Sequence, residues 1–142
     1  MNCPFCTNET KVLESRMSEK AVRRRRECLK CANRFTTFEK AEFHFLVHKK
    51  DGREEPFNLA KISTSIEKAC VKIEPSELEK ITTKVEHKIL AKKQGKIKTT
   101  EIGKIVLSEL RKYDKIAYLR FATVHKAIED PKILQKELHL IS

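Results

Sequence analysis

The sequence predicts an α+β protein, in which a small β module precedes a domain made of a β-hairpin and four or five helices. Three observations support this fold class. Residues 1–40 contain two closely spaced cysteine pairs and few long aliphatic side chains. Residues 43–57 alternate apolar and polar side chains around an Asp51-Gly52 turn signal. Beyond residue 60, apolar residues recur at intervals of three and four.

The cysteine pairs predict a metal site. One turn is Cys3-Pro-Phe-Cys6, the other is Cys28-Leu-Lys-Cys31, and 21 residues separate the two. This spacing suits one tetrahedral Zn²⁺ per chain, held by four thiolates that leave no position for water, so the ion is expected to be structural. The alternative is two unrelated pairs of buried or disulfide-forming cysteines. A segment with so little core needs metal to fold, which favours zinc.

The composition of the chain indicates which classes of molecule it can bind. The chain has 31 Lys and Arg against 20 Asp and Glu, and its net charge of +11 favours nucleic acid, a nucleotide or an acidic membrane surface. No run of about 18 apolar residues is present, so no membrane span is expected. Met1-Asn2-Cys3 leaves no room for a signal peptide, so a cytoplasmic location is expected, where thiols stay reduced. Cys70, the fifth cysteine, is expected to be core packing.

Two strands are expected after the β module. Phe43, Phe45 and Val47 alternate as a half-buried strand requires. Asp51-Gly52 predicts a two-residue hairpin turn, and residues 53–57 then return as a short partner strand.

Helices are expected from residue 60 onward. A capping-box pattern at 76–79 follows Pro75, Gly95 marks the end of that helix, and Thr99 or Thr100 caps the next. Residues 116–128 form another, and Asp130-Pro131 starts a short last one. The apolar positions that define the first three helical faces are Ile62, Ile66, Ala69, Ile73, Leu78, Ile81, Val85, Ile89, Ile102, Ile105, Val106 and Leu110.

A row of four arginines ends one residue before Cys28. On a strand, Arg23 and Arg25 point to one side while Arg24 and Arg26 point to the other, so one face can hold a nucleic-acid backbone. Arginine makes bidentate contacts with phosphate and with guanine edges. The alternative is a solvated charge run, but its position beside a metal turn favours nucleic-acid contact. The same surface is expected to include Arg34, Thr36 and Thr37.

The predicted hairpin at residues 47–57, together with Lys61 after it, is rich in cations. A basic hairpin that leads into a helix N-terminus can hold a triphosphate. An ordinary charged hairpin explains the same residues equally well. No glycine-rich phosphate loop occurs in the sequence, so a P-loop site is excluded.

Taken together, these segments resemble the NrdR family of bacterial transcriptional repressors of ribonucleotide reductase operons. The resemblance spans nearly the whole chain in the family's order. It is carried by Cys3-Pro-Phe-Cys6, Arg23–Arg26 leading into Cys28-Leu-Lys-Cys31, Arg34-Phe-Thr-Thr-Phe-Glu39, Lys49-Lys-Asp-Gly-Arg-Glu-Glu-Pro-Phe57 and Ala117-Tyr-Leu-Arg-Phe-Ala122.

The resemblance implies a zinc ribbon that binds double-stranded operator DNA, joined to an ATP-cone that binds ATP and dATP and controls a homo-oligomer. The implied domains are residues 1–42 for the ribbon, 43–132 for the cone and 133–142 for a C-terminal helical tail. By position, the nucleotide site is expected to include Val47, Lys49, Lys50, Asp51, Gly52, Glu55, Phe57 and Lys61, with Tyr118 and His125 on the helical side.

Four positions depart from the family pattern. Thr7 stands where glycine is common, Glu27 interrupts an arginine row that is often longer, and Lys50 replaces the usual arginine. His125 stands where tyrosine is expected, and the alternative for it is a structural histidine on a helix face.

The same residues allow two other functions. A zinc-ribbon accessory protein would dock on RNA or RNA polymerase without sensing nucleotides, and operator footprinting distinguishes it from a repressor. An ATPase is disfavoured because no base or Mg²⁺-binding carboxylate pair stands out. The protein is therefore expected not to be an enzyme.

Overall fold

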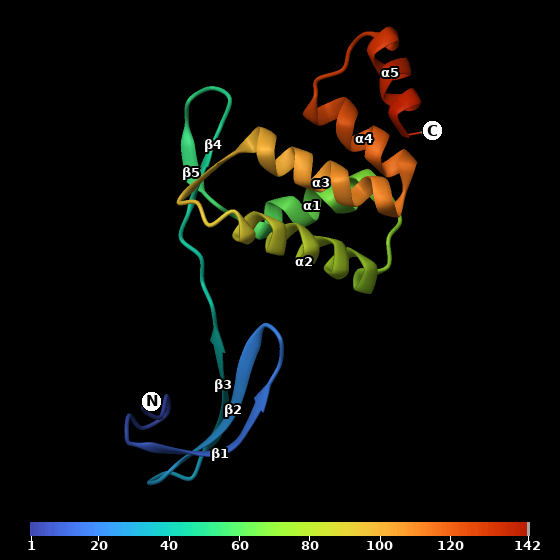
Figure 1. Ribbon diagram of the computed structural model, residues 1–142. Coiled ribbons are helices and arrows are strands. Elements are labelled where there is room, and N and C mark those ends of the chain that lie inside the picture. Colours follow the sequence, from blue (N-terminus) through green and yellow to red (C-terminus); the bar gives the residue numbers. More distant parts are fainter. Residues whose placement is uncertain (142) are drawn as a thin grey trace. The chain divides into compact units, whose positions relative to one another are not determined.

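The computed structural model describes residues 1–141, which form two compact units, Met1–Phe43 and the chain from His44 onward (Figure 1). The α+β class is confirmed, with small β-sheets in both units and helices in the second.

The first unit is a three-stranded antiparallel sheet. Its strands are β1 (Thr10–Met17), β2 (Ala21–Cys28) and β3 (Arg34–Lys40), with β2 in the centre. A bulge in β1 shifts the register between Val12 and Glu14. Within residues 1–43, only Cys3 and Cys28 are buried. Because the sheet has so little apolar core, its folding free energy has to come from elsewhere, as the sequence predicted.

The second unit contains a smaller sheet. Strands β4 (Leu46–His48) and β5 (Glu54–Pro56) form the expected hairpin, and β6 (Lys96–Lys98) pairs in parallel with the other edge of β4. The register places Val47 opposite Ile97, and both side chains are buried in the core. The first strand is shorter than the alternation predicted, because Phe43 lies outside it and is exposed.

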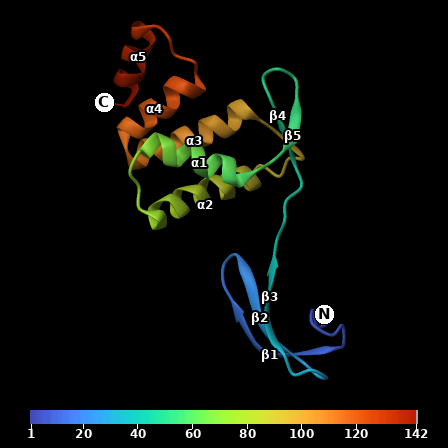
Figure 2. The same ribbon diagram turned by 180° about the vertical axis from the view of Figure 1, so that it is seen from behind.

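Five helices complete this unit: α1 (Leu59–Cys70), α2 (Pro75–Ala91), α3 (Thr99–Tyr113), α4 (Lys115–His125) and α5 (Pro131–Ile141). Helices α1, α2, α3 and α4 pack on one another around a core in which Ile66, Val85 and Leu110 are fully buried. Cys70 belongs to the same core, as expected. Helix α5 packs on α4, on the side away from the β4–β5 hairpin (Figures 1 and 2).

Two predicted caps are wrong. Helix α2 begins at Pro75, one residue before the capping-box motif, because proline fits the first helical turn; Glu74 is the N-cap and makes no side-chain capping bond. Helix α3 begins at Thr99 itself, so neither Thr99 nor Thr100 is its cap. The side-chain caps are Asn58 for α1 and Asp114 for α4, whose carboxylate or amide oxygens accept from Ala60 N and Ile116 N.

Helix α5 is fixed by buried polar contacts. Tyr118 Oη donates to Glu137 Oε2 at 2.8 Å, and the Lys126 ammonium pairs with Glu137 Oε1 at 2.5 Å. Arg111 Nη2 donates to the carbonyl of Leu140 at 2.7 Å. Glu137 is buried, and its contacts with Tyr118 and Lys126 offset the cost of burying its charge.

Candidate functional site

The four predicted cysteine ligands come together at one end of the first unit. Their sulfur atoms all lie within 4.8 Å of one another. Cys3 Sγ is 3.7 Å from Cys31 Sγ, and Cys6 Sγ is 3.3 Å from Cys28 Sγ. A tetrahedral Zn²⁺ with bonds of about 2.3 Å requires sulfur–sulfur distances of about 3.8 Å. The four thiols therefore fit one zinc ion, which would close the site to water.

Nitrogen donors around the sulfurs favour the thiolate form that a metal requires. The amides of Lys30 and Cys31 both donate to Cys28 Sγ at 3.3 Å, and Asn8 Nδ2 donates to Cys6 Sγ at 3.2 Å. The hydrogen bond from the Asn8 side chain is the main cause that lowers the pKa of Cys6 to about 6. Such donors orient metal ligands and stabilise their charge.

The residue after each cysteine pair has a left-handed backbone. Thr7 has φ 64° and Ala32 has φ 58°. A β-branched residue is strained in this region, which suits glycine. The turn after Cys6 thus keeps a left-handed geometry that favours glycine, even though Thr7 occupies it.

The arginine row lies on β2, the central strand of the ribbon sheet. Arg24 Nη1 donates to Glu39 Oε2 at 3.0 Å, and Arg26 Nε donates to Thr37 Oγ1 at 3.1 Å. Arg34 Nε donates to Glu27 Oε2 at 2.8 Å. Arg23, Arg25 and Thr36 complete the predicted set, and all seven residues lie on neighbouring strands β2 and β3.

The second unit contains a cavity of about 600 Å³ between the small sheet and helices α1, α3 and α4. Six of the ten residues predicted for a nucleotide line it: Val47, Lys49, Glu55, Phe57, Lys61 and His125. The predicted residues of the hairpin and of the end of α4 therefore line the same cavity, although 63 residues lie between Lys61 and His125 in the sequence.

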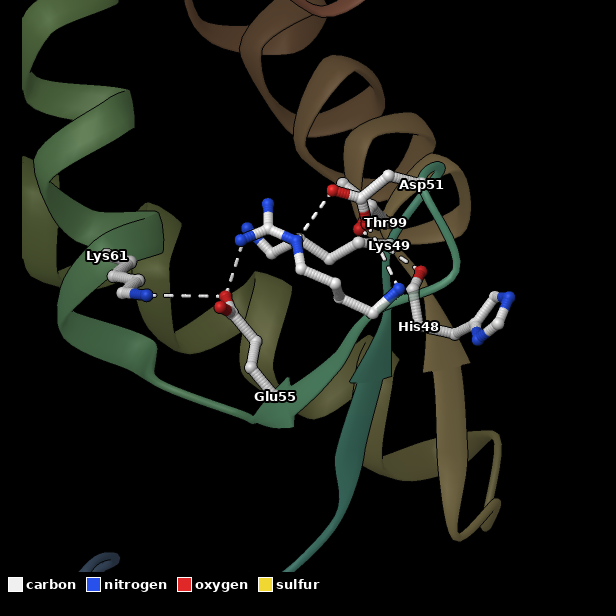
Figure 3. Close-up of polar contacts among 7 residues, drawn as sticks. His48, Lys49, Asp51, Glu55, Lys61 and Thr99 are labelled. Atoms are coloured by element: carbon white, nitrogen blue, oxygen red, sulfur yellow. Dashed lines mark hydrogen bonds and ion pairs between the residues drawn. The ribbon is translucent and has the colours of Figure 1, made fainter.

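One carboxylate in the cavity wall, that of Glu55, lies between two lysines. Glu55 Oε1 lies 3.0 Å from Lys49 Nζ and 3.3 Å from Lys61 Nζ (Figure 3). The hydrogen bond from Lys49, followed by that from Lys61, lowers the pKa of Glu55. Two ammonium groups that converge on one anion can hold a phosphate in the same way. Next to them, Thr99 Oγ1 donates to the carbonyl of His48 at 3.3 Å and joins α3 to β4.

His125 forms an aromatic part of the cavity wall. Its ring stacks on Phe121 with centroids 5.6 Å apart. It also lies directly against Gly103 of α3, where a Cβ would be 1.9 Å from His125 Cε1, so only glycine leaves room for the ring. Burial, followed by the charges of Lys50 and Lys126, lowers the pKa of His125, which favours the neutral imidazole.

The remaining four predicted residues do not line the cavity. Lys50 Nζ donates to the carbonyl of His125 at 3.4 Å, and Asp51 Oδ2 pairs with Arg53 Nε at 2.6 Å. Gly52 closes the hairpin with φ 90°, a conformation that explains glycine there. Tyr118 points to α5 and Glu137 instead.

Several cavity residues were not predicted from the sequence to belong to a binding site. Lys68, Arg120 and Ser65 add polar groups to the wall, and Arg120 Nη1 donates to the carbonyl of Ala69 at 3.2 Å. Apolar members from α3 and α4 include Ile102, Val106, Phe121 and Val124. Arg120 and Phe121 lie inside the 117–122 motif, so this motif could have indicated from the sequence that they belong to the site.

The fold and the two sites define a zinc-ribbon protein with an ATP-cone. The model of the Transcriptional repressor NrdR-like N-terminal domain matches residues 1–39, and the ATP cone domain model matches residues 45–131. Transcriptional repressor NrdR of Symbiobacterium thermophilum is 43% identical over 143 residues, covering 97% of this chain and 95% of that protein. Transcriptional repressor NrdR of Desulfitobacterium hafniense strain DCB-2 is 45% identical over 146 residues, covering 98% and 94%. The chain belongs to the NrdR family of transcriptional repressors.

Family membership bears out several expectations. The ATP-cone is a nucleotide-binding domain, and the role of the named relatives is regulatory and not enzymatic. No helix among residues 1–141 is long and apolar enough to span a membrane.

The first prediction concerns the metal. Cys28→Ser should abolish zinc binding and DNA binding while the helical unit stays folded, because the ribbon depends on its ligands. Metal analysis of the purified protein and circular dichroism at 222 nm measure the two effects. Cys70→Ser is the matched control, since Cys70 lies in the helical core and should leave one zinc per chain. Equal zinc in the wild type and Cys28→Ser would contradict the assignment.

Thr7→Gly should tighten zinc binding roughly threefold, because relief of a left-handed threonine, about 1–2 kcal/mol, outweighs the added freedom of glycine. Competition with a chromophoric chelator measures the affinity. Thr7→Ala is the control: both variants lose the hydroxyl that donates to the Cys6 carbonyl, but alanine keeps the Cβ. If the two variants bind zinc equally, strain at this turn is not significant.

Acidification should destabilise the helical unit through His125. Its pKa is lowered on folding, so the unfolded chain takes up the proton first, and stability is full above about pH 6.5 and falls as the pH drops below it. His125→Phe should flatten this dependence between pH 7.5 and 5.5, because phenylalanine keeps the ring stacking and cannot titrate. Urea unfolding followed at 222 nm measures it. An unchanged slope in the variant would remove His125 as the cause.

Proposed function

We propose that this protein is a nucleotide-sensing repressor that binds operator DNA upstream of ribonucleotide reductase genes, with its DNA affinity and oligomeric state set by ATP and dATP. The observation that carries the nucleotide part is the cavity in which Lys49 and Lys61 converge on Glu55. The zinc ribbon, with its arginine strand, is the DNA-binding part.

The cavity has the components that a nucleoside triphosphate needs. The two lysines supply charge for phosphates, and Phe57, Phe121 and His125 supply apolar and aromatic surface for a base. In the proposed complex, phosphate oxygens compete with the Glu55 carboxylate for the lysine ammonium groups. The volume of about 600 Å³ is in the range of small-molecule sites.

Sensing requires a difference between ATP and dATP. A ligand that binds two assemblies equally shifts neither, so the 2′-hydroxyl, or the number of nucleotides bound, has to change the free energy of one assembly relative to another. A difference of about 1.4 kcal/mol gives a tenfold preference. The defining test measures oligomer mass with ATP, dATP and both, and then measures binding to promoter fragments of ribonucleotide reductase genes in each state. Identical mass and DNA affinity with bound ATP and dATP would reject sensing.

Lys49→Ala should lower the affinity for ATP and dATP together, by roughly tenfold, because both nucleotides carry the same phosphates. Isothermal titration calorimetry on zinc-loaded protein measures both constants. Lys50→Ala is the matched control: it is the next residue and has the same charge, but Lys50 lies outside the cavity lining. An equal loss in both variants would indicate a general charge effect, and a loss confined to one nucleotide would place Lys49 near the sugar instead.

A further inference from the structure

The two faces of the ribbon sheet differ sharply in charge. Directly paired residues of antiparallel strands point to the same face. Arg23 pairs with Arg16 and Phe38, and Arg25 pairs with Glu14 and Thr36, so these side chains share one face, here called the basic face. It carries two carboxylates, Glu14 and Glu27, and six cations: Lys11, Arg16, Arg23, Arg25, Arg34 and Lys40.

The opposite face carries Arg24, Arg26 and Glu39, together with apolar residues such as Met17 and Val22. The strand residues thus give a net charge of +4 on the basic face and +1 on the opposite face. Both faces are open within residues 1–43, because the sheet is a single layer and β1 is exposed along nearly its whole length (Figures 1 and 2).

The arginines of the central strand β2 are also engaged differently on the two faces, whereas Arg16 and Arg34 of the basic face pair with Glu14 and Glu27. Arg24 and Arg26 donate to Glu39 and Thr37, and these bonds join β2 to β3. No residue of the described chain accepts a hydrogen bond from the side chains of Arg23 or Arg25. Both lie near Glu14, whose pKa is lowered first by its hydrogen bond from Arg16 and less by the charges of Arg23 and Arg25. Their guanidinium groups are available for an external anion.

The basic face also exposes an aromatic ring. Phe38 is 60% exposed, although it is one of the largest apolar side chains of the unit, and Lys40 Nζ lies 5.5 Å from its centroid. An aromatic ring surrounded by cations suits a ligand that presents phosphates beside flat apolar surface. Duplex DNA has this chemistry, because its phosphates flank sugars, base edges and thymine methyl groups.

We propose that the basic face is the DNA-binding face, with Arg23 and Arg25 on phosphates or base edges and Phe38 against sugar or base, whereas Arg24 and Arg26 stabilise the sheet. The inference rests on the proposed DNA-binding function and selects one of two possible surfaces. It adds Phe38, Lys11, Arg16 and Lys40 to the expected contact residues and removes Arg24, Arg26 and Thr37 from direct contact.

The test compares two double variants that remove the same charge from the same strand. Arg23→Ala/Arg25→Ala should weaken binding to promoter fragments and to random duplex DNA by roughly tenfold or more. It should also reduce the slope of log K against log salt by about 1.8 units, if each arginine neutralises one phosphate. Arg24→Ala/Arg26→Ala should leave the slope unchanged. Full-length, zinc-loaded protein is used, and one zinc per chain in each variant shows that the ribbon is intact.

An equal or larger loss in Arg24→Ala/Arg26→Ala would overturn the face assignment while leaving DNA binding by the ribbon in place. Unchanged binding in both double variants would overturn the face assignment and also DNA binding by the ribbon sheet, since DNA would then bind outside this sheet. Phe38→Ala should lower affinity without altering the salt slope, because its contact is uncharged. Met17→Ala, which removes a side chain 85% exposed on the opposite face, should change neither quantity; a loss there equal to that in Phe38→Ala would count against the proposal.

Discussion

The ribbon has almost no apolar interior, and this constraint governs everything that its sheet can do. Two buried side chains, Cys3 and Cys28, are too small a core to offset the conformational entropy that about forty residues lose on folding. A structural zinc site contributes about 10–16 kcal/mol of apparent free energy in small metal-dependent domains. Since Cys28 is the last residue of β2, the ligand cluster also anchors the strand that carries the arginines. Zinc binding, the register of the strands and the positions of the arginines are consequently coupled to one another.

In the second unit, the corresponding constraint is that carboxylates next to the apolar core need cationic partners. Glu55 lies between two lysines, and Glu109, which is buried, pairs with Lys88 and Lys112. The lysines of the two groups differ in what they can do. Glu109 is enclosed, so its partners stabilise a fixed arrangement of α2 and α3. Glu55 lines an open cavity, so under the proposed function its lysines exchange this carboxylate for a phosphate, and water can solvate the released Glu55 carboxylate.

Sequence patterns predicted those features that are encoded locally. The cysteine spacing predicted a four-thiolate cluster, and Asp51-Gly52 predicted the hairpin, because a metal turn and a two-residue loop each depend on a few adjacent residues. The capping box failed because Pro75 starts α2 one residue earlier than the motif suggests. Strand β6 was not predicted, since Lys96-Ile97-Lys98 is too short to show a period and is a strand only because β4 provides a partner. Gly103 is another such case: nothing in the α3 sequence indicates that a ring from α4 lies against it.

The last helix shows that a sequence boundary and an energetic boundary can differ. The ATP cone match ends at residue 131, and residues 133–142 are predicted to form a C-terminal helical tail outside the cone. Yet Glu137 and Ile141 are buried, and Glu137 binds Tyr118 and Lys126 at the two ends of α4. If α5 detached, Tyr118 would lose its hydrogen-bond acceptor and the Lys126 ammonium would lose its counterion. Detachment of α5 would therefore break buried polar contacts as well as helix ends, so opening of this end should cost more free energy than the fraying of an exposed helix.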